Sequence, residues 1–498
     1  MSFKIYNSLS RKKEVFKPIH KGKVSIYTCG QTVYDDLHLG HARTYSYWDV
    51  LVRYLRYKGY EVTHVQNFTD VGHLTSDADE GEDKIEKRAK ERKVDPYALV
   101  EKFIQRYFED LDALNLNRAD IYPRATQHVQ EMIDLTKRII KSGYAYEKDG
   151  NVYFKVRKFK DYGTLSPTPI LQKKSKCRVH ADTNKNDPND FTLWRKVDSN
   201  VIMKWDSPWS VGVPGWHVEC SAMSMKYLGE TLDIHGGGYD HLYLHHPNEI
   251  AQSEAATSKR FANYWMHTTF MTLNGEKMSK STGNMLLIRD ALKMYDWEAL
   301  RLTLVSSHYR KQIDFNKSNV RNSEALLLRV YRVFERVQES TGGKSESLNK
   351  WIREYRVSFE KAMDDDLNTP KAVDVTMLFL KKVSQSLGNK KSILEKSVET
   401  VKELLRVLGL RLDKEIVIGV TSGSSVKVTL SWKELVKKVS GSLKKKNKID
   451  GLMEQLISLR VEARSKKDYA TSDDIRTALK KAGVELEDTD SGVKWRVK

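Results

Sequence analysis

The sequence KVSIYT at residues 23–28 is rich in β-branched and aromatic residues and predicts a short strand. Residues 40–57 follow with apolar and aromatic side chains at helical spacing, among them Val50, Leu51, Tyr54 and Leu55. Residues 60–65 then return to a strand pattern. A strand, a helix and a second strand in this order predict an α/β fold with a doubly wound parallel sheet, which binds ligands at the carboxyl ends of its strands.

The composition is that of a basic globular protein. The 498 residues include 85 Lys plus Arg against 66 Asp plus Glu, a net charge of +19, and 40% are hydrophobic. This apolar fraction excludes a disordered or fibrous chain. The positive charge favours a polyanionic partner, although a lysine-rich surface explains it equally well.

The chain contains no apolar leader and no run of about 20 apolar residues, so we expect no membrane segment. Its three cysteines, Cys29, Cys177 and Cys220, are too scattered for a disulfide framework. Such scarcity suits a reducing compartment, and we expect a cytoplasmic location.

Changes in pattern along the chain predict several domains. Residues 119–204 contain hairpin-like runs and polar turns, residues 323–410 show apolar residues at helical spacing, and residues 431–498 contain 17 Lys plus Arg against 11 Asp plus Glu. We expect the first half of the sheet at 1–118, an inserted connective domain at 119–204, the second half of the sheet with a lysine-rich loop at 205–315, a helical bundle at 316–411, a linker at 412–430 and a small basic domain at 431–498.

The sequence HLGH at residues 38–41 lies between the first predicted strand and helix. Unpaired N–H groups and the helix dipole favour phosphate at such a position, and Gly40 lets a nucleotide approach the backbone. His38 and His41 would then both meet a triphosphate. Two surface histidines around a turn glycine are the alternative.

The sequence KMSKS at residues 277–281 lies between Gly275 and Gly283. These glycines allow a loop to move, and Lys277 and Lys280 can neutralise charge on a departing pyrophosphate. A basic surface loop without a catalytic role is the alternative.

Together, the HxGH and KMSKS motifs resemble those of the class I aminoacyl-tRNA synthetases. Three more segments, YTCG at 27–30, PGWHVECSAM at 214–223 and LHHPNEIAQS at 244–253, are similar to the cysteinyl-tRNA synthetases in particular. The resemblance implies a Rossmann-type catalytic domain with an inserted domain, followed by a helical bundle and a small C-terminal anticodon-binding domain. It also implies that L-cysteine and ATP, bound with Mg²⁺, form cysteinyl-adenylate, and that the cysteinyl group passes to the 3′ end of tRNA(Cys). We expect a monomer.

Cys29, Cys220, His245 and Glu249 supply two thiolates, an imidazole and a carboxylate, and the resemblance assigns these four to one Zn²⁺ ion. His246 also faces Glu249 on the predicted helix, and only the resemblance selects His245. Zinc would bind the substrate thiolate and so select cysteine over serine, because a hydrophobic pocket separates such near-isosteres by only about 10- to 200-fold. Since catalytic zinc keeps a position open, we expect a loosely bound Glu249 or a fifth ligand. For each cysteine, a small buried apolar residue is the alternative.

The resemblance implies the remaining roles. The residues assigned to catalysis are His38, His41, Lys277 and Lys280, and ATP binding adds Gly40, Ser279, Gly236 and Gly237 to these four. The substrate cysteine is assigned to Trp216, Thr69 and Asp240. Recognition of the anticodon is assigned to Arg464, Asp473 and Asp488. The glycines follow a strand-like run at residues 231–234, where missing side chains would let adenosine approach. Ordinary packing, a plain turn and solvated charges are the alternatives.

Two departures from the family pattern stand near these residues. Residues 72–74 (GHL) replace acidic residues, and Pro247 replaces a common acid. Two rival functions also remain. One is the cysteine ligase of mycothiol synthesis, which lacks a full tRNA-binding tail, and the other is a non-catalytic RNA-binding paralogue, which has no need of both motifs and the zinc ligands.

Overall fold

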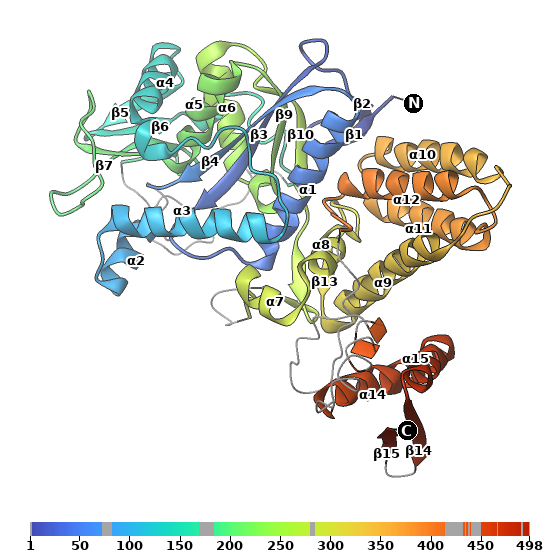
Figure 1. The fold of residues 1–498 in the computed structure, drawn as a ribbon. Coiled ribbons are helices and arrows are strands. Elements are labelled where there is room, and N and C mark those ends of the chain that lie inside the picture. Colours follow the sequence, from blue (N-terminus) through green and yellow to red (C-terminus); the bar gives the residue numbers. More distant parts are fainter. Residues whose placement is uncertain are drawn as a thin grey trace. The chain divides into compact units, whose positions relative to one another are not determined.

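The computed structural model describes residues 2–71, 82–168, 184–278, 284–413, 432–433, 435–436, 439, 450–465, 467–489 and 492–497 (Figure 1). Several predicted positions lie outside the described residues, namely residues 72–74, Cys177, Ser279, Lys280 and most of the expected linker. The side chains of Lys277 and Asp488 are also not described. The chain forms two compact units, Met1–Glu324 with Arg336–Leu410, and Ala325–Glu335 with Arg411–Lys498. Among the described helices, none is long and apolar enough to cross a membrane.

A four-stranded parallel sheet forms the centre of the first unit, in the order β10-β9-β3-β4. Its strands are β3 (Lys23–Thr32), β4 (Glu61–Thr69), β9 (Leu232–Gly238) and β10 (Ala262–Thr268), and α1 (Leu39–Tyr57) joins β3 to β4. Strand β3 pairs with β4 on one side and with β9 on the other, so the strand order reverses there. The predicted strand, helix and strand are confirmed, and the reversal lies where doubly wound sheets bind ligands.

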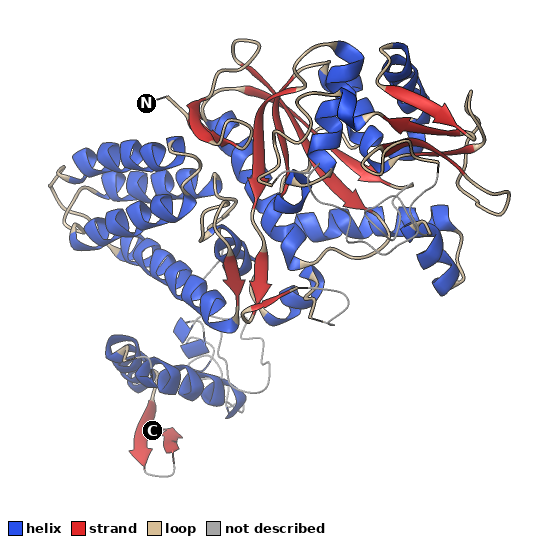
Figure 2. Cartoon of the chain, turned by 180° about the vertical axis from the view of Figure 1, so that it is seen from behind, coloured by secondary structure: helices blue, strands red, loops and turns tan. Residues whose placement is uncertain are grey.

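Helices pack against this sheet, and Figure 2 shows its strands running between them. Helix α1 contacts β4, β9 and β10, and α5 (Trp216–Leu228) contacts β3 and β4. Helix α6 (His245–Thr257) packs on α5 and on α4 (Val129–Lys141). Because helices lie against the sheet, the second halves of β3 and β4 are mostly buried. Their residues therefore do not alternate between buried and exposed positions.

An antiparallel sheet interrupts the two halves of the parallel sheet. It contains β5 (Ala145–Lys148), β6 (Asn151–Phe154), β7 (Phe191–Lys196) and β8 (Gly212–Pro214), in that order. The sheet therefore continues to Pro214, beyond the expected boundary at residue 204. At its other boundary, Ile121 and Arg124 pair with Val65 and Phe68 of β4, so the chain extends the parallel sheet before it enters the insertion.

Shorter elements complete the first unit around the parallel sheet. They are β1 (Lys4–Asn7), β2 (Lys12–Val15), α2 (Lys84–Arg92), α3 (Pro96–Ala113), β11 (Met271–Leu273), β12 (Glu276–Lys277), α7 (Ile288–Met294), α8 (Trp297–Val305) and β13 (Ile313–Phe315). Strands β12, β11 and β13 form a small sheet.

The predicted helical region contains α9 (Lys317–Glu339), α10 (Leu348–Asp364), α11 (Thr369–Gln385) and α12 (Lys391–Arg406). Tyr355 of α10 stacks on Phe379 of α11, with 4.4 Å between the ring centres. Aromatic pairs of this kind fix the contact between neighbouring helices.

The second unit contains α14 (Asp450–Ser465), α15 (Tyr469–Lys481), β14 (Val484–Thr489) and β15 (Gly492–Val497). Its core includes Leu456, Ile475 and Leu479. Arg332, in the part of α9 that belongs to this unit, forms a 2.7 Å ion pair with Asp468.

Candidate functional site

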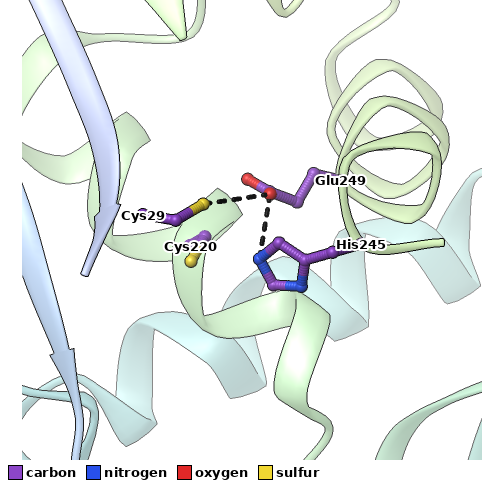
Figure 3. A group of neighbouring side chains, drawn as sticks. All are labelled: Cys29, Cys220, His245 and Glu249. Atoms are coloured by element: carbon purple, nitrogen blue, oxygen red, sulfur yellow. Dashed lines mark hydrogen bonds and ion pairs between the residues drawn. The ribbon is translucent and has the colours of Figure 1, made fainter. Parts of the chain in front are cut away.

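Four of the predicted residues converge at the carboxyl edge of the parallel sheet (Figure 3). Cys29 comes from β3, Cys220 from α5, and His245 and Glu249 from the first turns of α6. Their ligand atoms lie within 4.8 Å of one another, and all four side chains are buried. His245 Nε2 is 3.1 Å from Glu249 Oε1, and the Cys29 thiol donates to the same oxygen over 3.9 Å.

Strand β3 places Cys29 through an irregularity in its pairing. The register between β3 and β4 shifts between Thr28 and Gln31, and a shift of this kind changes the face toward which a side chain points. Gly30 lies in the shift, and a Cβ atom there would be 1.7 Å from the carbonyl oxygen of Asn67. Only glycine allows this approach, and the Gly30 N–H then donates to Asn67 Oδ1 over 2.9 Å.

The surroundings of the two buried thiols disfavour the thiolate unless a cation is bound. Burial raises the pKa of Cys29 well above its usual value, and Cys220 and Glu249 raise it further. The hydrogen bond with Cys29 lowers the pKa of Cys220, but burial and Glu249 outweigh it, and the pKa is raised overall. A divalent cation stabilises thiolates, and two sulfur donors with an imidazole and a carboxylate form a donor set that zinc accepts. The residues therefore fit a zinc ion.

Two further histidines contact His245 and Glu249 from outside the group. His217 Nδ1 is 2.8 Å from His245 Nδ1, and His235 Nε2 is 2.8 Å from Glu249 Oε2. These contacts involve His245 Nδ1 and Glu249 Oε2, and leave His245 Nε2 and Glu249 Oε1 facing the group. His217 and His235 therefore fix the orientation of His245 and Glu249.

His246 contacts Cys29 and His267, and its Nε2 also lies 3.8 Å from Glu249 Oε1. Its Nε2 lies 3.3 Å from Cys29 Sγ, and its Nδ1 lies 2.7 Å from His267 Nε2. Burial lowers the pKa of both His246 and His267 well below the usual value, so both rings are neutral. Cys29, His235, His246 and Glu249 form a second group with ligand atoms within 4.8 Å, which shares two members with the first.

Sequence reasoning missed His217, His235 and His267 as parts of this site. His235 stands one residue before the glycines of β9, and the strand pattern gives no sign that it meets α6. The pairing of β9 with β3 and β10 brings it there, and this pairing has no signature in a single sequence.

The HLGH motif begins α1 as predicted, with His38 as the N-cap residue. His38 Nδ1 accepts from the N–H groups of Gly40 at 3.0 Å and His41 at 3.4 Å, and the two imidazoles stack with 3.8 Å between ring centres. The N–H groups that we expected to be unpaired are therefore satisfied, since histidine caps the helix itself. A phosphate at this position would meet the two rings first.

The segment that follows the KMSKS motif lies against the HLGH motif. The Leu39 N–H donates to the Leu286 carbonyl over 3.0 Å, and the Ile288 N–H donates to the Leu37 carbonyl over 2.9 Å. Met278 also approaches Gly40, because a Cβ atom on that glycine would be 3.3 Å from its Cε. The two motifs, far apart in the sequence, therefore adjoin each other.

The residues predicted to bind cysteine have different surroundings. The Trp216 ring lies 4.5 Å from the His245 ring, next to the ligand cluster. Thr69 is buried at the end of β4, where its Oγ1 accepts from Asn67 Nδ2 over 3.1 Å. Asp240 follows β9, and its side chain is 67% exposed.

The interpretation of residues 236–238 as a segment that follows a strand is wrong, because β9 continues through Gly238. A Cβ atom on Gly236 would be 2.9 Å from the Trp48 ring, and one on Gly237 would be 2.6 Å from His241 and 2.7 Å from His246. These rings leave no room for a side chain at either position.

The predicted anticodon residues belong to the second unit. Arg464 lies in the last turn of α14, and Asp473 is exposed on α15. Asp488 lies in β14, where its side chain is not described.

Two family models match the chain. Residues 15–325 match the class I (C) tRNA synthetase catalytic domain, and residues 358–413 match the DALR domain. The chain is 43% identical over 499 residues to a cysteine–tRNA ligase of Chlorobium chlorochromatii, and the match covers 100% of both chains. It is also 43% identical over 501 residues to the cysteine–tRNA ligase of Thermus thermophilus, again over 100% of both.

Solved structures with a similar fold include the methionyl-tRNA synthetase of Mycobacterium tuberculosis in complex with methionyl-adenylate. The TM-score is 0.60 at 14% identity, over 78% of this chain and 91% of that one. The leucyl enzyme of Agrobacterium radiobacter gives 0.57 at 12% identity, over 80% and 85%. At such low identity, these likenesses show the fold alone.

Proposed function

Because the chain belongs to the cysteine–tRNA ligase family of class I aminoacyl-tRNA synthetases, we propose that it charges tRNA(Cys) with L-cysteine. In the first step, a carboxylate oxygen of cysteine attacks the α-phosphorus of ATP, and pyrophosphate leaves. In the second, a ribose hydroxyl at the 3′ end of the tRNA attacks the activated carbonyl, and AMP leaves. The observation that carries this proposal is the buried group of Cys29, Cys220, His245 and Glu249.

Cys29, Cys220, His245 and Glu249 would hold one Zn²⁺ ion. When bound, the ion would supply a thiophilic centre that distinguishes the thiol of cysteine from the hydroxyl of serine. Trp216 stands against His245 and would form a wall of the amino-acid pocket. Thr69 and Asp240 would orient the substrate amine.

The two signature motifs would act on the phosphates. His38, His41, Lys277 and Lys280 would stabilise negative charge as pyrophosphate leaves, and Mg²⁺ would enter bound to ATP. Gly40 and Ser279 would bind ATP at the same place, and Gly236 and Gly237 would contribute backbone near the adenosine. The contact between residues 37–39 and 286–288 supports a joint action of the two motifs.

Other parts of the chain would recognise the tRNA. We assign residues 1–118 and 205–315 to catalysis, 119–204 to the connective insertion, 316–411 to the bundle, and 431–498, after a linker at 412–430, to the anticodon through Arg464, Asp473 and Asp488. A monomer in the cytoplasm completes the proposal. The expected division of labour is that the second unit affects charging but not activation.

Charging of purified tRNA(Cys) with labelled cysteine in the presence of ATP tests the proposal, with serine in a parallel reaction. Cysteine-specific charging is the expected outcome, and serine should be charged at least about a thousandfold less efficiently, beyond what a pocket of suitable size provides. Cysteine-dependent ATP–pyrophosphate exchange without charging would contradict the tRNA acceptor and favour a ligase with another acceptor.

A further inference from the structure

A cavity of about 450 Å³ lies in the first unit, and none of its lining residues belongs to the candidate site. The loop between α8 and β13 forms one wall, and β2 and the start of α11 form the others. Its lining includes Lys13, Ser307, His308, Arg310, Lys311 and Asn368. The lining contains three permanent cations and no carboxylate, so it favours an anion.

The cations differ in how far they are already neutralised. Arg310 Nε lies 2.8 Å from the buried Asp366 carboxylate, and Lys13 Nζ lies 2.6 Å from Asp365. Asp365 is 54% exposed, so water screens that pair. Lys311 is exposed and forms no ion pair with any described residue. Its ammonium is therefore the uncompensated charge of the cavity.

The loop that carries Lys311 is held in place by its backbone. Arg43 Nη2 donates to the carbonyls of His308 at 2.9 Å and Lys311 at 3.3 Å. The Tyr309 hydroxyl donates to Asp366 Oδ1 over 2.6 Å. Because internal donors fix the loop, a ligand would find the cationic lining already formed, without the entropic cost of ordering it.

We propose that this cavity, with Lys311 as its principal cation, binds a phosphate group of the tRNA backbone. The proposal rests on the proposed function, which supplies the polynucleotide. Lys311 and Ser306 are exposed at the cavity, which makes it accessible to a long chain, and the net charge of +19 attracts one. The N-terminus of α11, with Asn368 as its cap, adds a favourable dipole.

Binding of tRNA(Cys) to the full-length Lys311→Met protein, measured over a series of salt concentrations, tests the proposal. Methionine keeps an apolar stem of similar length and removes the charge. We expect the Kd to rise about three- to tenfold, and the slope of log Kd against log salt to fall by about 0.7 to 1, because one phosphate contact is lost. Lys311→Arg should restore both.

Lys21→Met is the matched control, since Lys21 is also exposed but lies before the amino end of β3, away from the cavity. Its Kd and slope should match those of the wild type. Unchanged values in Lys311→Met would overturn the proposal. So would an equal loss of cysteine-dependent ATP–pyrophosphate exchange, which uses no tRNA and would reveal a structural role. Failure of the wild type to charge tRNA(Cys) would instead refute the proposed function, and the binding comparison would still test the cavity.

Discussion

His245 and His246 are neighbours in the chain with different surroundings. His245 Nε2 lies 3.1 Å from Glu249 Oε1. His246 Nε2 lies 3.8 Å from the same oxygen but closer to Cys29 Sγ, at 3.3 Å, and its other nitrogen contacts His267. If His245 binds the metal and His246 supports a ligand, the two substitutions to glutamine differ sharply. His245→Gln should abolish stoichiometric zinc, and His246→Gln should keep it with affinity lowered about 10- to 100-fold.

Zinc content after dialysis, measured by atomic absorption, checks this prediction, and competition with a chelator gives the affinities. The two variants are matched, since each replaces a buried imidazole in the same turn of α6. Loss of zinc from His246→Gln but not from His245→Gln would assign the metal to the group that contains His235 and His246.

His64 couples two neighbouring strands of the parallel sheet, β3 and β4. Its Nε2 lies 2.9 Å from Thr28 Oγ1 of β3, and its backbone N–H donates to Asp120 over 2.8 Å. Burial lowers the pKa of His64 to about 4, against an unfolded value of about 6.5. As the pH falls, His64 therefore binds its proton in the unfolded chain before it does so in the folded one. Its contribution to the stability of the fold is fully present above about pH 6.5 and is lost as the pH falls toward about 4.

We expect the wild type to lose about 2 kcal/mol of unfolding free energy from His64 alone between pH 7 and pH 5, and about 3 kcal/mol by pH 4. His64→Gln can keep a hydrogen bond to Thr28 but has no titrating group, so it should lack this loss. Urea unfolding of both proteins at pH 7, pH 5 and pH 4 measures the difference. An identical pH dependence would mean that His64 is charged or exposed in the fold.

The strands and helices show what a single sequence can reveal. Residues 23–28 and 40–57 form β3 and α1 as predicted, because local periodicity determines both. The position of Gly236 and Gly237 after the strand was wrong, because β9 continues through Gly238, and the rings of Trp48, His241 and His246, which leave no room for a side chain there, come from other elements. The same limit explains the ligand cluster. Its four residues were found by resemblance and i, i+4 spacing, whereas the histidines around them depend on strand pairing.

The chain separates into two units, which the sequence only partly indicates. The basic residues 431–498 do fall in the second unit, but that unit also takes residues 325–335 from the middle of α9. The apolar spacing of a helix is the same on both sides of such a boundary. It predicts which face of the helix is buried but not which unit that face packs against.

A chain truncated after Asp413 should separate the two steps of the proposed reaction. It keeps the parallel sheet, the ligand cluster and α10 to α12, so cysteine-dependent ATP–pyrophosphate exchange should stay within about threefold of the wild type. Charging should fall at least about a hundredfold, because loss of several phosphate and base contacts costs several kcal/mol. Initial rates of exchange and charging measure both effects.

Thermal unfolding is the control for the truncation, since part of α9 loses its partners in the second unit. A transition that stays within a few degrees of the wild type would validate the comparison. Equal losses of exchange and charging would contradict the separation of roles, and undiminished charging would exclude the second unit from recognition.

The pair of thiols in the ligand cluster has one more consequence. Cys29 and Cys220 are buried with their sulfur atoms within 4.8 Å of each other, and they come from different elements, β3 and α5. In the absence of a cation, a mild oxidant that enters this space finds two reduced sulfurs close enough to be joined after a small movement. A bound ion would then prevent a disulfide bond between Cys29 and Cys220, and so keep the site intact during oxidative stress or storage.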